Sequence, residues 1–161
     1  MKGKLSIFKI SLNGIITLLF GAVFIIALPL IAIFFVDVFI SFISIFDPLH
    51  QGKNINSLWK AFPTIIVLQI IFGCLAGFIS GVGISLLWQT KGDTNFYLYS
   101  VVIGFSIHFI FQVFSTLILA LFYGEIVVFS WAITAFAIIL IFSPLIGLLS
   151  AFICKKISRK I

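Results

Sequence analysis

The chain has 161 residues, of which 63% are hydrophobic and only 9% are charged, and its formal net charge is +6. A soluble domain carries about 25% charged residues, so this composition excludes a surface that is mainly exposed to water. The sequence therefore predicts a membrane protein whose surface is covered largely by lipid.

Four apolar stretches are each long enough to cross a hydrocarbon core, which takes about 20 helical residues. They cover about residues 10–36, 62–88, 97–123 and 126–153. A single span in lipid has to satisfy its own backbone hydrogen bonds, so each stretch is predicted to be an α-helix. We expect an all-α membrane protein in which residues 1–161 form one domain with four transmembrane helices.

Basic residues concentrate on one side of this predicted topology. That side carries Lys2, Lys4, Lys9, Lys91, Lys155, Lys156, Arg159 and Lys160. The opposite side carries only Lys53 and Lys60. Since Lys and Arg are enriched in cytoplasmic segments, both termini are predicted to be cytoplasmic. The basic residues from Lys91 onward are then candidate contacts for a cytosolic partner.

The net positive charge does not indicate direct binding to nucleic acid, because the basic residues form short flanks and no folded basic face. No Asn-x-Ser/Thr sequon occurs, and Ile, Phe and Lys are frequent. Both features favour the inner membrane of a bacterium, with lipid as the main surrounding.

The first apolar stretch is too long for one span. A helix over residues 10–46 would measure about 56 Å, compared with a hydrocarbon core of about 30 Å. We expect a kink at Pro29 and an extension on the outer surface, followed by an outer loop, over about residues 37–61. Asp37 and His50 are the candidate residues there. Asp37 is interpreted as an interfacial carboxylate that can pair with Lys60 or His50.

The second span carries a small or polar residue at every fourth position, in the manner of a glycine zipper. The series is Gln69, Gly73, Gly77, Gly81 and Ser85. Residues four apart share one helix surface, and small residues let helix backbones approach closely in lipid. The partner is left open between another span of the same chain, an identical subunit, and a pore or ligand site.

The third span continues this spacing over a longer distance. Its series is Ser100, Gly104, His108, Gln112, Thr116, Ala120 and Gly124. Each step of four residues rotates the stripe by about 40°, so its two ends should meet different neighbours. A monomer can supply two neighbours, but a homo-oligomer does so more readily, and we expect a homo-oligomer.

His108 and Gln112 lie near the middle of this span, one turn apart. An ionisable residue inside a membrane is a candidate functional site, with roles in proton relay, gating or ligand contact. The structural alternative is a neutral histidine that hydrogen-bonds to Gln112, to Gln69 or to a helix carbonyl.

Enzymatic chemistry finds no support in the sequence. It contains no His-Glu-x-x-His, Gly-x-Ser-x-Gly or P-loop motif, and its four acidic residues lie far apart. Cys74 and Cys154 lie in or beside apolar spans, which argues against a disulfide framework. We therefore expect neither catalysis nor a bound cofactor or metal.

Three functions fit these features. The first is a non-enzymatic subunit that oligomerises, senses the envelope and anchors or regulates a cytosolic partner. The second is an oligomeric ion channel or a protein that permeabilises membranes, with the His108 and Gln112 face lining the path. The third is a subunit of a transporter, for which a pair of discontinuous helices would be needed.

In size, in its four predicted spans and in its basic ends at Lys2, Lys4, Lys9 and Lys155 to Lys160, the chain resembles the KwaA family. KwaA proteins are the small four-span membrane subunits of the bacterial Kiwa anti-phage defence system. The resemblance implies a homo-oligomer that senses phage action at the envelope and works with a cytosolic DNA-binding effector. It implies no role for any single residue.

Overall fold

A computed structural model describes residues 6–21, 51–91, 95–123 and 125–159, and these residues are almost entirely helical. An N-terminal helical segment covers Ile7–Gly21. It is followed by α2 (Gln51–Lys91), α3 (Phe96–Phe122) and α4 (Glu125–Arg159). The backbone of Asn95, directly before α3, is left-handed with a φ of 54°, which makes the turn into this helix.

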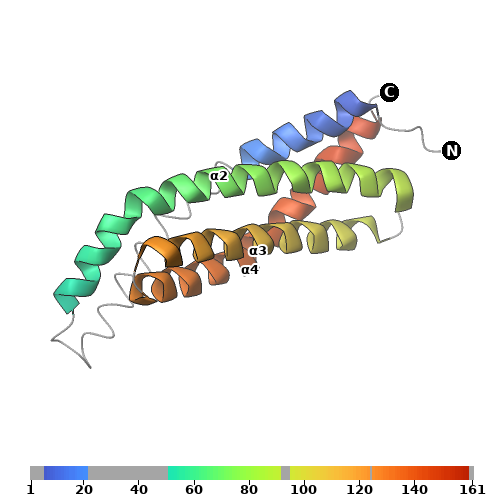
Figure 1. Cartoon of the computed structure of the whole chain (residues 1–161). Coiled ribbons are helices and arrows are strands. Elements are labelled where there is room, and N and C mark those ends of the chain that lie inside the picture. Colours follow the sequence, from blue (N-terminus) through green and yellow to red (C-terminus); the bar gives the residue numbers. More distant parts are fainter. Residues whose placement is uncertain (1–5, 22–50, 92–94, 124, 160–161) are drawn as a thin grey trace.

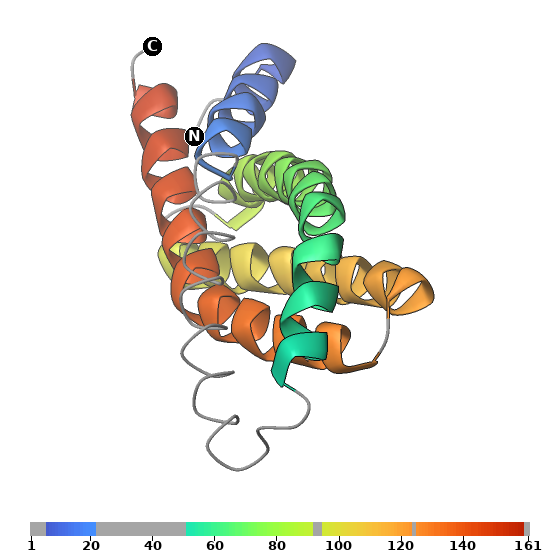
Figure 2. The same ribbon diagram turned by 90° about the vertical axis from the view of Figure 1, so that its left-hand side faces the viewer.

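The three long helices lie against one another, and each of them contacts the other two (Figure 1). The N-terminal helical segment lies beside the C-terminal half of α2 (Figure 1) and starts at the end of the bundle where α4 finishes (Figure 2). The start of the N-terminal helical segment and the end of α4 therefore lie at the same end of the bundle. Assignment of this end to the cytoplasm stays a prediction.

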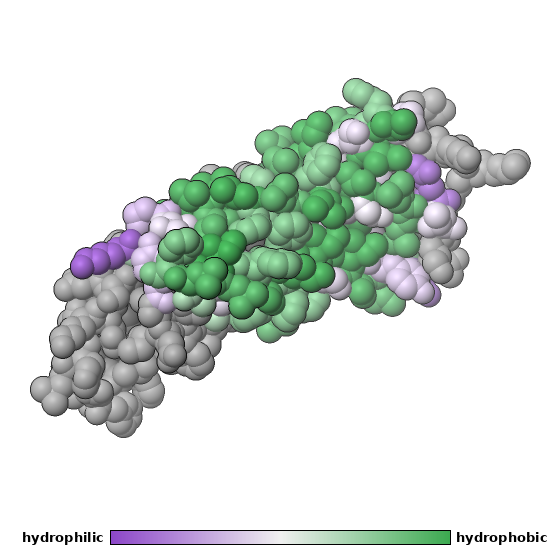
Figure 3. Space-filling view, in the orientation of Figure 1, coloured by the Kyte–Doolittle hydropathy of each residue, from purple (hydrophilic) through white to green (hydrophobic). Residues whose placement is uncertain are grey.

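Among the described residues, three helices are long and apolar enough to cross a membrane. These stretches are Lys60–Thr90, Phe96–Phe122 and Ile139–Ser158. Figure 3 shows apolar side chains over the middle of the molecule and hydrophilic ones towards its two ends. The all-helical class is thus confirmed, and the length and composition of these three helices are consistent with a membrane protein. The N-terminal helical segment is shorter, and residues 22–36 of the predicted first span lie outside the described residues.

The start of α2 differs from the prediction. The sequence predicted an outer extension and loop over about residues 37–61, followed by a second span from about residue 62. Instead, α2 already begins at Gln51 and runs through Pro63. A helix can continue through proline at the loss of one hydrogen bond, usually with a bend, and α2 bends along its N-terminal part (Figure 1). Residues 22–50, which include Asp37 and His50, lie outside the described residues.

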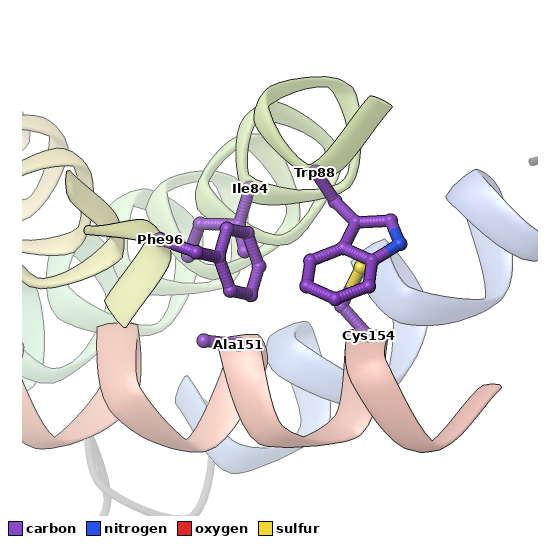
Figure 4. Close-up of a cluster of buried hydrophobic side chains, with 5 residues drawn as sticks. All are labelled: Ile84, Trp88, Phe96, Ala151 and Cys154. Carbon is purple, nitrogen blue, oxygen red and sulfur yellow. The ribbon is translucent and has the colours of Figure 1, made fainter. Parts of the chain in front are cut away.

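A cluster of buried apolar side chains fastens the helices together near one end of the bundle. It consists of Ile84, Trp88, Phe96, Ala151 and Cys154 (Figure 4). The rings of Trp88 and Phe96 meet edge to face, with centroids 4.7 Å apart, a favoured geometry for aromatic pairs. Ile10 of the N-terminal helical segment packs against the cluster, so all four helical pieces meet there.

Candidate functional site

The glycine face of α2 packs against the N-terminal helical segment of the same chain. A Cβ atom on Gly81 would lie 2.8 Å from both Asn13 O and Gly14 Cα, and one on Gly77 would lie 2.9 Å from Thr17 O. No side chain larger than hydrogen fits at such distances from a backbone. Glycine is thus required at both positions, as the small-x-x-x-small spacing predicted.

This contact continues at Gly73, whose carbonyl oxygen would lie 3.2 Å from a Cβ atom on Gly21. Of the three partners left open by the sequence, the structure therefore matches another span of the same chain. Because the N-terminal helical segment covers this face, the homo-oligomer expected from the sequence would have to use another surface.

Four short polar side chains meet where the N-terminal helical segment, α2 and α4 come together. We call Asn13, Thr17, Ser85 and Ser150 the Asn13 cluster; each is at most 1% exposed. The Asn13 amide donates to Gly81 O at 2.8 Å and to Ser85 Oγ at 2.9 Å, and lies 3.3 Å from Ser150 Oγ. The Thr17 hydroxyl lies 3.0 Å from Ser150 Oγ. The cluster thereby links three helices.

The α3 stripe meets two different helices, as its rotation predicted. Near its start it crosses α4, where a Cβ atom on Gly104 would lie 2.9 Å from Gly147 Cα. A Cβ atom on Gly147 would in turn collide with Ser100 O. Further along, Gln112 contacts Gln69 on α2. Both neighbours belong to the same chain, so the long stripe does not by itself require an oligomer.

A second set of polar side chains joins α2 to α3. The Gln69 cluster consists of Gln69, Gln112, Ser115 and Thr116. Gln69 Nε2 donates to Gln112 Oε1 at 3.1 Å and to Ser115 Oγ at 3.2 Å, and Gln112 Nε2 donates to Thr116 Oγ1 at 3.4 Å. The two glutamine side chains span the helix interface directly, so Gln69 and Gln112 are brought together as packing residues.

His108 bonds to its own helix. Its Nδ1 lies 2.8 Å from Gly104 O, which agrees with the helix-carbonyl alternative and not with a bond to either glutamine. A carbonyl oxygen can only accept, so Nδ1 carries a hydrogen, and in the neutral ring Nε2 then carries the lone pair. Nε2 is buried and has no hydrogen-bond partner among the described residues.

Two further buried polar atoms share this property. They are Asn13 Oδ1 and Ser80 Oγ, and neither has a partner among the described residues. Most buried polar groups in proteins are hydrogen-bonded, so each exception calls for an explanation. Together with His108 Nε2, these atoms are buried groups in the bundle that can still form a hydrogen bond.

Of the basic residues proposed as cytosolic contacts, the structure describes the side chains of Lys155 and Lys156. The Lys155 Nζ atom lies over the Tyr97 ring, 5.3 Å from its centroid, and Lys156 is exposed. The side chains of Lys91 and Arg159, and the whole of Lys160, lie outside the described residues.

The sequence analysis did not identify the partners of the α2 glycine face and of the α3 stripe, although these partners also carry small or polar residues at every fourth position. Asn13, Thr17 and Gly21 follow each other at every fourth position, and so do Ser143 and Gly147. Searching the first and last spans for the spacing found in the middle two would have identified these residues.

The described residues contain no group of three or more His, Cys, Asp or Glu side chains that could hold a metal ion. Comparisons with protein families, with curated proteins and with solved structures found no match for the chain. Evidence about its function therefore comes from the helices and their buried polar contacts.

Proposed function

We propose that the protein is a non-enzymatic membrane subunit that acts by assembling with other chains. The observation that carries this proposal is the use of its polar side chains. In the Asn13 and Gln69 clusters, amide and hydroxyl groups form hydrogen bonds between helices. Such groups hold a bundle together, and a protein built in this way acts through what it contacts at its surface and ends.

The end of the bundle shared by the N-terminal helical segment and α4 is the proposed contact region for a cytosolic protein. It carries the exposed Lys156 and, beside it, Lys155 over the ring of Tyr97. Positive charge next to an aromatic ring suits an acidic surface on a partner, since electrostatic complementarity guides docking. The proposal takes this end to be cytoplasmic, in keeping with the positive-inside rule.

Self-association is proposed through a face other than the glycine face of α2. Gly77 and Gly81 are supported as packing residues within the chain. The outward side of α3, unlike the glycine face of α2, is accessible to a second copy of the chain. The exposed side chains on α3 include Val102, Phe109, Ile110, Phe114 and Leu117. In lipid, two such faces would pack by van der Waals contact.

Affinity purification tests the proposal directly. A tagged copy, expressed at its natural level and extracted in mild detergent, is expected to bring down a cytosolic protein in fixed stoichiometry. The matched control is Lys155→Glu combined with Lys156→Glu, which should release that protein without changing the amount of subunit in the membrane. Recovery of the chain with no stoichiometric partner would contradict the proposal.

The resemblance to KwaA extends the proposal to anti-phage defence. Deleting the gene in its host is then expected to raise phage plating efficiency. A complementing copy with Lys155→Glu and Lys156→Glu should fail to restore protection. Unchanged plating across a broad phage panel would remove the defence role and leave the assembly role in place.

A further inference from the structure

We propose that His108 is a proton-loading site inside the bundle, so that the protein passes protons across the membrane. This inference does not depend on a cytosolic partner, and it adds an activity to the assembly role. It is carried by the geometry of the imidazole and by the polar atoms on either side of it.

The bond from His108 to its own helix fixes what the ring can do. Nδ1–H donates to Gly104 O at 2.8 Å, so the ring is held with its basic nitrogen, Nε2, on the other side. His108 is 8% exposed, and Nε2 has no partner among the described residues. An unpaired base buried in a low-dielectric interior is unfavourable unless something binds there.

Polar groups lie on both sides of His108 along the bundle. Gln69 meets Gln112, and further on Gly83 lies opposite Ile103. The two helices run antiparallel. Ser80 lies between Gln69 and Gly83 on α2, and His108 lies between Ile103 and Gln112 on α3, so both residues lie between the two contacts. Along the bundle, the Gln69 cluster therefore lies on one side of His108, and Ser80 lies on the other side, towards Gly83 and Ile103.

Ser80 leads to the Asn13 cluster. It precedes Gly81, whose carbonyl oxygen accepts from Asn13 Nδ2 at 2.8 Å. The hydroxyl of Ser80 and the Oδ1 of Asn13 are both buried without partners among the described residues. A water molecule inside a protein typically makes about three hydrogen bonds to such groups. Water molecules bound along this line would connect His108 to both clusters.

The proton step follows from the fixed tautomer. A hydronium ion gives its proton to the Nε2 lone pair, so that one O–H bond breaks, one N–H bond forms and the ring becomes an imidazolium. The Gly104 carbonyl, bound at Nδ1–H, cannot carry a proton onward. The same Nε2–H bond therefore has to break again, and the proton then passes to a water molecule that lies further along the bundle. His108 loads and unloads at one nitrogen and does not relay through its ring.

Few other titratable groups can replace His108. No Asp, Glu, Lys or Arg occurs in α2 between Lys60 and Lys91, and none occurs in α3. The helices around His108 otherwise offer the thiols of Cys74 on α2 and Cys154 on α4, and the phenols of Tyr97 and Tyr99 in the first turn of α3. Lys9, Glu125 and Lys155 lie near the ends of their helices. His108 is accordingly the group on which a proton path through this interior depends.

Proton uptake by proteoliposomes containing a pH-sensitive dye tests the activity. Under an imposed membrane potential the wild type is expected to exceed empty liposomes at least tenfold. His108→Asn should fall to the level of empty liposomes, since its amide can still donate to Gly104 O but cannot take up a proton. Ser106→Ala, at an exposed α3 position, should match the wild type. Equal flux from His108→Asn and wild type, or wild-type flux no greater than that of empty liposomes, would overturn the proposal.

Nitrogen-15 NMR of the histidine side chain gives a test that needs no transport. The chain has two histidines, so His50→Gln leaves His108 as the single signal. The spectrum should show hydrogen on Nδ1 alone at neutral pH and on both nitrogens after acidification. A hydrogen on Nε2 at neutral pH, or an imidazole that never gains a second proton, would overturn the assignment even if His108→Asn failed to fold.

Discussion

The Asn13 cluster and the Gln69 cluster both join neighbouring helices through buried polar side chains, but these side chains differ in length. Around Asn13, glycines on α2 bring two backbones so close that short groups suffice: an asparagine, a threonine and two serines. Around Gln69 the helices are bridged by two long amides. The lesson is that the spacing of the backbones, set by glycine, decides which polar side chain can join a pair of helices.

The surroundings of the two clusters agree with this interpretation. Near the Gln69 cluster, α2 and α3 also pack through Phe72 and Phe111, whose ring centroids lie 5.9 Å apart. Gly83, the α2 glycine that faces α3, has only the side chain of Ile103 near its missing Cβ, at 3.6 Å, among the described residues. Bulky side chains thus fill the α2–α3 interface, while backbone meets backbone at the glycine face.

The largest effect is expected from Gly81→Ala, which breaks the close contact. The new Cβ atom would lie 2.8 Å from two backbone atoms, Asn13 O and Gly14 Cα, and neither can move without shifting its helix. Overpacking typically costs about 1–3 kcal/mol, and we expect the upper part of that range. Unfolding by denaturing detergent, followed by circular dichroism, measures the loss.

Gly83→Ala is the matched control on the same helix. Its Cβ atom would lie at an ordinary van der Waals distance from Ile103, and alanine stabilises a helix interior by about 0.5–1 kcal/mol relative to glycine. The comparison between the two clusters fails if Gly81→Ala and Gly83→Ala unfold at the same detergent concentration.

A smaller loss is expected from Asn13→Ala, which leaves the glycine contact in place but removes the amide at its centre. Hydrogen bonds between membrane helices contribute about 0.6 kcal/mol on average and at most about 1.7 kcal/mol. Since Asn13 reaches both Ser85 and Ser150, we expect a loss of about 1–2 kcal/mol in the same unfolding measurement. A variant as stable as the wild type would show that glycine packing alone holds this junction.

The Gln69 bridge should show coupling. Gln69→Leu leaves Gln112 Oε1 without its donor, so the single change is expected to cost about 1 kcal/mol. Gln69→Leu with Gln112→Leu removes both polar groups, and the double variant should be less destabilised than the sum of the two single variants. Strict additivity in this double-mutant cycle would mean that the bond of 3.1 Å contributes no coupling energy.

The smallest effect is expected at the end of the bundle. Lys155→Gln removes the charge that lies over the Tyr97 ring, and a cation–π pair at an accessible site contributes about 0.5–1 kcal/mol. We expect a loss at the lower end of this range that disappears when Tyr97→Leu is already present. An equal loss in the Tyr97→Leu background would assign the effect to Lys155 alone.

Much of this architecture could be predicted from the sequence, because lipid leaves few options for the backbone. The helical membrane class and the boundaries of 97–123 followed from apolar length, and α3 covers Phe96–Phe122. The spacing of Gly73, Gly77 and Gly81 correctly predicted close helix packing. The rotation of the α3 stripe correctly predicted two different neighbours.

The partners could not be derived in the same way. A glycine face fits any helix that offers a complementary surface, so Gly77 and Gly81 alone do not distinguish Thr17 and Asn13 of the same chain from a second copy. The helical start at Gln51 was missed because a polar stretch before Pro63 looks the same in a loop and in a bent helix. His108 was recognised as buried, but only the position of Gly104 O shows which nitrogen is left unpaired.

The central claim is that the glycine face of α2 is covered by the N-terminal helical segment of its own chain. A Cβ atom on Gly14 would lie 3.0 Å from Val82 Cγ2, which places the two positions within reach of a disulfide. We would combine Gly14→Cys and Val82→Cys with Cys74→Ser and Cys154→Ser, oxidise the protein in native membranes and run a non-reducing gel. We predict a monomer with an internal disulfide and no cross-link in either single-cysteine variant. A covalent dimer through these positions would contradict the claim.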